Sequence, residues 1–169
     1  MALLFDAIAS NDGNAGLLEG ETLRIFMRIG IVVNPDAGLG GRLGFKGSDG
    51  RAAEARAAGA EDRAGPRMYQ TLEDLKTLLL SSLNRSNVEL ECLGWKGRMG
   101  DAWMPTSNEK MFFTQIGETP AETSMIETSQ LVTTLVESGA EAILYAGGDG
   151  TTRDITNTLE GISKEAQEI

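Results

Sequence analysis

The stretch "ILYAGGDGTTRDI", residues 143–155, constrains the fold more than any other part of the chain. An apolar, strand-forming run leads directly into Gly147, Gly148, Asp149 and Gly150, and Thr151 then opens a segment of helix-forming character. A buried strand that turns at once into a helix is the repeating unit of βαβ folds. The stretch therefore predicts a parallel sheet with a glycine-rich turn at the carboxyl end of one strand.

The rest of the chain carries the same alternation of strands and helices. Apolar or alternating runs predict strands over residues 27–34, 87–94, 110–117 and 141–146. Helical spacing of apolar residues predicts helices over 71–83, capped by Thr71, and over 121–138. A short helix is predicted in 51–61, ending at Gly59 or at Gly65-Pro66, and another over 151–159, where Thr151 and Asp154 have capping-box-like spacing.

This alternation predicts an α/β fold, a three-layer sandwich around a mostly parallel, Rossmann-like sheet. A chain of 169 residues suits one domain of this kind. Residues 1–26 lack sustained periodicity and contain the turn-rich stretch "SNDGNAG", so we expect a loose N-terminal extension there. The α/β domain is expected over residues 27–169.

Charge and composition exclude several classes of function. The net charge is −10, and the 15 Lys and Arg residues form no run, which argues against nucleic acid or an anionic membrane as a partner. No apolar stretch approaches about 18 residues, so no membrane-spanning helix is expected. With no histidine and one cysteine, the chain lacks the residues for Ser-His-Asp or Cys-His catalysis, His-ligated zinc and an internal disulfide. Cys92 is predicted as a half-buried strand residue, and a cytoplasmic location is expected.

The turn at residues 147–150 has the chemistry of a phosphate site. Glycines can take positive φ and let a ligand approach the backbone, and the following helix directs its free N–H groups at that ligand. A carboxylate at Asp149 could hold Mg²⁺ against phosphate oxygens or accept a proton from an attacking hydroxyl. The plain structural alternative is an Asp-Gly turn, but three glycines between a strand and a helix favour the ligand hypothesis.

A second glycine-rich loop, "NPDAGLGGRLGFKGSDG", follows the strand predicted at 27–34. It matches neither the P-loop nor the Rossmann fingerprint. Five glycines between Gly38 and Gly47, with Arg42 and Lys46 among them, could wrap the phosphates of a nucleotide, although a flexible surface loop is nearly as well supported. Both loops follow the carboxyl ends of predicted strands, where parallel sheets bind ligands, so one crevice could receive both.

These two stretches carry a family resemblance. The motif "AGGDGT" after a strand, together with "VVNP" and its glycine loop, resembles the superfamily of NAD kinases, diacylglycerol-type lipid kinases and phosphofructokinases. Within it, "IGIVVNPDAGLGGRLGFKGSDG" and "GGDGTTRDI" look most like the ATP-NAD kinase-like proteins that include the AcoX group. The resemblance implies a phosphofructokinase-like sheet, and it covers roughly residue 27 to the end.

The resemblance implies transfer of a phosphoryl group from ATP or polyphosphate to the 2′-hydroxyl of the adenosine ribose of NAD, giving NADP. Asp149 would activate that hydroxyl or help to position Mg²⁺ or another divalent cation. The nucleotide would be held by two sets of residues: Asn34, Gly38, Gly40 and Gly41 in the first loop, and Gly147, Gly148, Gly150 and Thr151 in the second. Arg42, Lys46 and Arg153 are further candidates on charge alone, for which a solvated surface role is the simpler interpretation.

Three alternatives stay open at this point. Diacylglycerol-type lipid kinases share the two motifs, and Asp154 and Asn157 match their spacing, although their first loop is shorter. The second is a non-catalytic nucleotide-binding or assembly module, and the third is a purely structural α/β domain. A homo-oligomer is compatible with each of them. Because NAD kinase-like proteins continue into a β-rich second domain, whereas this sequence stops at Ile169, we expect these residues alone to be inactive or nearly so.

Overall fold

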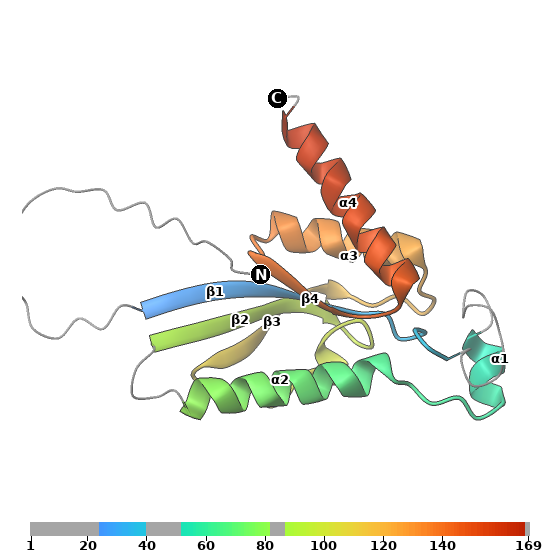
Figure 1. The fold of residues 1–169 in the computed structure, drawn as a ribbon, viewed down its shortest axis with the longest axis horizontal. Coiled ribbons are helices and arrows are strands. Elements are labelled where there is room, and N and C mark those ends of the chain that lie inside the picture. Colours follow the sequence, from blue (N-terminus) through green and yellow to red (C-terminus); the bar gives the residue numbers. More distant parts are fainter. Residues whose placement is uncertain (1–23, 40–51, 82–86, 168–169) are drawn as a thin grey trace, which may run out of the picture.

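The computed structural model describes residues 24–39, 52–81 and 87–167, which form a parallel sheet covered by helices on both faces (Figure 1). One helix covers one face of the sheet and two lie on the other, as expected for a three-layer α/β sandwich. The elements in chain order are β1 (Arg24–Val33), α1 (Ala52–Ala57), α2 (Ala64–Ser81), β2 (Asn87–Lys96), the 3₁₀ turn η1 (Asp101–Trp103), β3 (Met111–Glu118), α3 (Met125–Glu137), β4 (Ala142–Ala146) and α4 (Asp149–Gln167).

The four strands pair in the order β3-β2-β1-β4, and every pairing is parallel. The chain moves outward from β1 to β2 and β3, then crosses back to place β4 on the other side of β1. In that pairing Val33 lies beside Ala146, so β1 and β4 end at the same level. The predicted Rossmann-like α/β fold is therefore confirmed, with an all-parallel sheet in the part of the chain that the structure describes.

Alternate residues of β1 build the two halves of the core. Ile31 and Val33 face α2 and pack with Met68 and Leu72, all of them buried. Val32 faces the other side, where it packs with a second buried cluster that includes Leu93, Leu131, Leu135 and Ile155. A strand buried on both faces explains why residues 27–34 have a nearly continuous apolar sequence.

Helix α4 begins at the sheet and then leaves it. Its buried residues are Thr151 and Ile155, both in its first two turns, and its main packing partner is α3. Figure 1 shows the remainder of α4 extending away from the sheet toward the C-terminus. The end of α4 that is firmly seated is thus the end that carries the glycine-rich turn.

Helix α2 begins seven residues earlier than the sequence indicates. The structure places Gly65 and Pro66 inside its first turn, where the missing N–H of proline costs no intrahelical hydrogen bond. The prediction that Thr71 caps this helix is wrong. Thr71 lies in its second turn, and its hydroxyl donates to the carbonyl of Arg67 at 2.9 Å.

Three smaller expectations also need correction. Strand β1 begins at Arg24, three residues before the predicted boundary at Met27. Helix α3 begins at Met125 rather than near Ala121, because Ser124 is its N-cap and forms a capping box with Glu127. Cys92 is fully buried, not half-buried, because its side of β2 is covered by α2. A loose extension is predicted over residues 1–26, of which 1–23 lie outside the described residues and 24–26 belong to β1.

Candidate functional site

The carboxyl ends of β1 and β4 form the point at which the strand order reverses. From β1 the chain passes to β2 on one side of the sheet, whereas β4 arrives on the other side. In open α/β sheets ligands bind outside the carboxyl ends of strands at this switch point. The backbone N–H of Asn34 donates to the carbonyl of Ala146 at 2.9 Å, so both predicted loops leave the sheet from adjacent positions.

The side chains of Asn34 and Thr151 join these two loops directly. Asn34 Nδ2 donates to Thr151 Oγ1 at 2.8 Å, and Asn34 Oδ1 accepts from the N–H of Asp36 at 3.0 Å. Thr151 is only 2% exposed. Both side chains therefore help to hold the two turns together, which gives each of them a positioning role.

The glycines after β4 do not adopt the backbone conformation expected from the sequence. None of Gly147, Gly148 and Gly150 has positive φ, although Gly38 in the first loop does, at +80°. A Cβ on Gly147 would lie 2.5 Å from Thr151 Cβ, so this glycine is required by packing. Within the described residues, a Cβ on Gly148 or Gly150 would meet nothing within 4 Å. Contacts among these residues therefore give no reason for glycine at the two positions.

Asp149 is the first residue of α4 and is exposed. The predicted helix start at Thr151 is wrong by two residues, since the N–H of Thr152 already donates to the carbonyl of Gly148 at 3.0 Å. The capping-box-like pair of Thr151 and Asp154 is also wrong, because the Thr151 hydroxyl accepts from Asn34 instead. Asp149 thus lies in the first helical turn, where a carboxylate interacts favourably with the helix dipole.

The first glycine loop is described only as far as Leu39. Gly38 stands in a tight turn that follows Pro35, and Leu39 after it is buried against the protein. The predicted nucleotide-binding residues Gly40 and Gly41, and the candidate cations Arg42 and Lys46, lie outside the described residues. Arg153 is exposed on α4.

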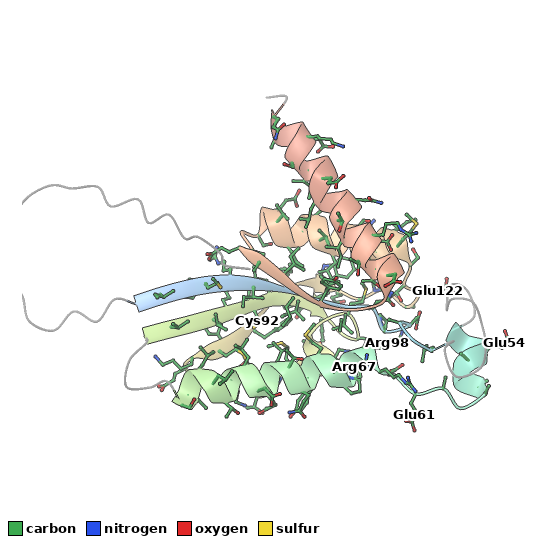
Figure 2. All side chains as sticks on the ribbon, in the orientation of Figure 1. Glu54, Glu61, Arg67, Cys92, Arg98 and Glu122 are labelled. Atoms are coloured by element: carbon green, nitrogen blue, oxygen red, sulfur yellow. The ribbon has the colours of Figure 1, made fainter. Side chains whose placement is uncertain are left out.

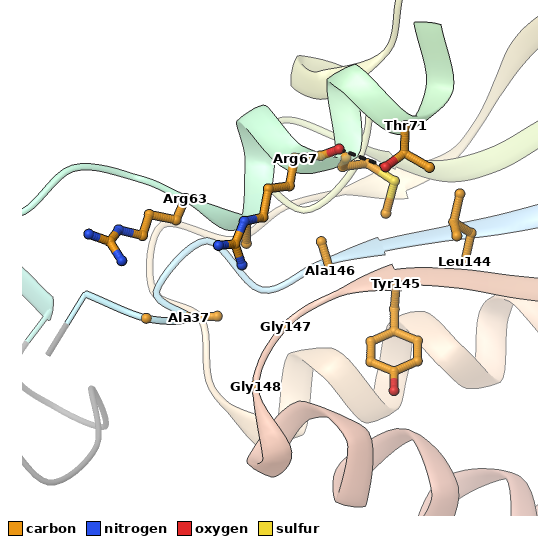
Figure 3. Close-up of a pocket in the computed structure, with 12 residues that line it drawn as sticks. Ala37, Arg63, Arg67, Thr71, Leu144, Tyr145, Ala146, Gly147 and Gly148 are labelled. Carbon is orange, nitrogen blue, oxygen red and sulfur yellow. Dashed lines mark hydrogen bonds between the residues drawn. The ribbon is translucent and has the colours of Figure 1, made fainter. Parts of the chain in front are cut away.

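A cavity of about 370 Å³ opens beside the switch point, between α2 and β4 (Figure 3). Gly38, Gly147 and Gly148 line it, whereas Asn34, Asp149, Gly150 and Thr151 do not. The other lining residues come from the first loop, from α2 with the residue before it, and from β4: Ala37, Arg63, Ala64, Arg67, Met68, Thr71, Leu144, Tyr145 and Ala146.

Arg63 and Arg67 are the charged residues of this cavity, and the site predicted from the sequence does not include them. Both flank Gly65-Pro66, which is, with Gly59, one of the two places where the sequence predicts the end of a helix and not the beginning of one. The signal for these two residues is the true start of α2 at Ala64. An arginine just before a helix and another in its first turn are unfavourable, because both lie at the positive end of the helix dipole. Figure 2 shows Arg67 close to the carboxyl edge of the sheet.

Asp149 is the acidic side chain of the glycine-rich turn. In the described ranges no group of three or more Asp, Glu or Cys side chains could hold a metal ion. Magnesium in phosphoryl-transfer sites commonly uses one or two carboxylates, with substrate phosphates and water supplying the other ligands. A single carboxylate at the start of α4 fits that type of ion.

Cys92 plays no part in the site. Burial, together with the negative charge of Glu91, raises the pKa of its thiol to about 11.

Helices long and apolar enough to cross a bilayer do not occur in the three described segments.

Comparison of this chain with protein-family models, with curated proteins and with solved structures gives no match. Family membership therefore stays a hypothesis that rests on the two glycine-rich motifs.

Proposed function

We propose that this chain is a nucleotide-binding phosphotransferase domain of the ATP-NAD kinase-like type. In this proposal ATP or polyphosphate donates a phosphoryl group to the 2′-hydroxyl of NAD, giving NADP. The observation that carries the nucleotide-binding part is the turn at Gly148 and Gly150, where neither backbone conformation nor packing against the described residues requires glycine. Without a Cβ at these two positions, a ligand can approach the backbone on both sides of Asp149, where helix α4 begins.

The surroundings of this turn suit a phosphate group. The turn ends a strand at the switch point of the sheet and begins a 19-residue helix, whose first N–H groups have no partners within the helix. Helix N-termini of this kind stabilise phosphate through those N–H groups and through the helix dipole. The hydrogen bond from Asn34 to Thr151 fixes the turn against the end of β1, which pre-organises it.

Asp149 is the residue proposed for the chemistry. Its carboxylate is exposed at the start of α4, and in the described segments the site has no histidine or thiol that could serve as a base. It could accept the proton of the attacking hydroxyl or contribute one ligand to a phosphate-bound Mg²⁺. NAD as the acceptor rests on the long, glycine-rich first loop, which resembles ATP-NAD kinase-like proteins more than lipid kinases.

Ligand binding tests the proposal first. Isothermal titration of the full chain with ATP, NAD and a soluble diacylglycerol analogue, each with and without Mg²⁺, should detect binding of ATP and NAD. Binding of the diacylglycerol analogue but not NAD would favour a lipid kinase instead. If neither ATP nor NAD raises the Tm at concentrations well above a micromolar Kd, the nucleotide-binding proposal is wrong.

A variant of Asp149 separates catalysis from simple binding. Asp149→Asn should remove most of the Mg²⁺ dependence of ATP affinity and lower any rate of NADP formation by about 10²–10⁴-fold. Glu165→Gln removes the same charge from the far end of α4 and should leave both quantities unchanged. Unchanged Mg²⁺ dependence in Asp149→Asn, with no NADP formed by either protein, would indicate a non-catalytic nucleotide-binding module.

A further inference from the structure

The cavity between α2 and β4 has a charge opposite to that of the protein. The chain carries 25 acidic and 15 basic residues, yet the residues that line this cavity include two arginines and no carboxylate. No ion pair to Arg63 or Arg67 is formed within residues 24–39, 52–81 and 87–167. Two such guanidinium groups beside one cavity provide donors for an anion.

The position of these arginines is unfavourable for the fold alone. Arg63 immediately precedes α2 and Arg67 lies in its first turn, which contains no acidic residue. Positive side chains at the positive end of an 18-residue helix destabilise it, whereas carboxylates there would stabilise it. Residues that break such a rule of helix stability without a gain in packing are typical of functional sites, and Arg63 and Arg67 break it here.

The rest of the cavity is apolar on one side. Met68 on α2 and Leu144 on β4 face each other there, and Ala64 and Ala146 add small side chains that leave space between the two elements. Figure 3 shows Arg67 extending from α2 toward the end of β4 that carries Gly147 and Gly148. The cavity therefore has an apolar floor and a cationic end that meets the glycine-rich turn.

We infer that this cavity binds the nucleotide, with its base on the apolar floor of Met68 and Leu144 and its phosphates between Arg67, Arg63 and the Gly147–Gly148 turn. The inference rests on the proposed function and adds the side of the sheet on which the nucleotide lies, together with its two charged contacts. A planar base joined to a di- or triphosphate matches a cavity with an apolar floor and one cationic end. Arginine is suited to this role because the donors of its planar guanidinium group can form hydrogen bonds to two phosphate oxygens at once.

Titration of the full chain with ADP, inorganic pyrophosphate and adenosine tests the inference. Arg67→Gln should weaken ADP and pyrophosphate binding about tenfold or more, since a hydrogen bond to a charged group is lost, and should leave adenosine binding unchanged. Arg63→Gln should act in the same direction, and Arg67→Lys should retain part of the affinity. Both glutamine variants should keep or raise the Tm, because each removes an unfavourable charge from the start of α2.

Lys164→Gln is the matched control. Lys164 is an exposed cation in the last turn of α4, about 20 Å along the helix from Gly150, so the same change of charge there should not alter ADP affinity. If wild type binds ADP and both arginine variants bind it equally well, the inference is overturned while nucleotide binding stands. If wild type binds no ADP, the proposed function fails together with the inference. If pyrophosphate binding depends on the arginines but ADP binds no more tightly than pyrophosphate, the inference that the apolar floor binds the base is overturned.

Discussion

Asn34 and Thr151 are 117 positions apart in the sequence, and their side chains form a 2.8 Å hydrogen bond at the reversal point of the sheet. Asn34 follows β1, and Thr151 lies in the first turn of α4. This contact connects the two glycine-rich motifs that the sequence singles out. It also explains why a threonine follows the Gly-Gly-Asp-Gly turn, since the hydroxyl is buried and accepts from the asparagine.

Loss of this hydrogen bond should destabilise the fold measurably. Thr151→Val leaves Asn34 Nδ2 without its partner in a part-buried position, so the free energy of unfolding should fall by about 1–3 kcal/mol. Asn34→Ala should have a similar effect. The double variant should cost less than the sum, because the second change removes a group that has already lost its partner.

Urea unfolding of the four proteins measures this coupling. Thr152→Val provides the control, because the Thr152 hydroxyl makes an exposed contact with the Tyr145 hydroxyl at 3.0 Å. Its effect should stay within about 0.5 kcal/mol. Strict additivity of the two single changes at Asn34 and Thr151 would contradict a direct link between the loops.

Gly150→Ala should separate stability from ligand binding. An alanine at this position meets no neighbour and improves the helix, so the free energy of unfolding should rise by roughly 0.5–1 kcal/mol. The added Cβ lies where the proposed phosphate approaches, so ATP affinity should fall. Gly161→Ala, in the same helix and also in open space, should give the gain in stability without the loss of affinity. Equal ATP affinities in both variants would count against a phosphate at the turn.

Stability should depend on pH through Glu91. Burial raises the pKa of this carboxylate, but hydrogen bonds from Thr114 at 2.7 Å and Arg28 at 2.8 Å, and the charge of Arg28, outweigh burial and lower the pKa below 4.5. A carboxylate with a lowered pKa in the folded state stabilises the protein above its unfolded pKa, and this stabilisation is lost as pH falls through the folded pKa. Wild type should therefore lose stability with decreasing pH below 4.5.

Chemical unfolding at a series of pH values shows whether Glu91 is responsible. Glu91→Gln should be less stable than wild type at pH 7, and its stability should fall less steeply in the acidic range. Glu160→Gln, which changes an exposed side chain of α4, should follow the wild-type curve. Identical slopes for Glu91→Gln and wild type would show that the ion pair does not contribute.

Cys92 should be protected from thiol reagents in the folded protein. Its side chain is fully buried against α2, and burial raises its pKa to about 11, so little thiolate forms near pH 8. We expect reaction with a small alkylating reagent to be slow in buffer and fast in denaturant, as measured by mass spectrometry. Rapid labelling of protein that retains its native circular dichroism spectrum would contradict the packing of β2 against α2.

The sequence predicted the strands well because the strand signal is local. A continuous β-branched run identified β1, and the end of β4 was set by the glycines that follow Ala146. It failed at the beginning of α2, where Gly65-Pro66 has the appearance of a break. Gly65 is required there by a distant contact, since a Cβ on it would lie 2.0 Å from Trp103 Cε2. A contact between residues 38 positions apart in the sequence leaves no local pattern.

The site likewise combines features with a local sequence signal and features that depend on distant contacts. The glycine motifs and Asp149 were found from the sequence, because a strand that runs into glycines and then into a helix is a local signal. The sequence does not single out Arg63 and Arg67, which tertiary packing brings to the cavity. It predicts Asn34 and Thr151 as nucleotide contacts, and the structure adds that their side chains are hydrogen-bonded to each other.

The amino-acid sequence by itself determined the elements of this protein, since hydrophobic periodicity and β-branched content act over a few residues. The tertiary structure decided which elements meet. The strand order β3-β2-β1-β4 depends on pairing between distant segments and on helices that cover both faces of the sheet. Only that order brings the ends of β1 and β4 together, and only the seating of α2 gives the acidic chain a cationic cavity beside them.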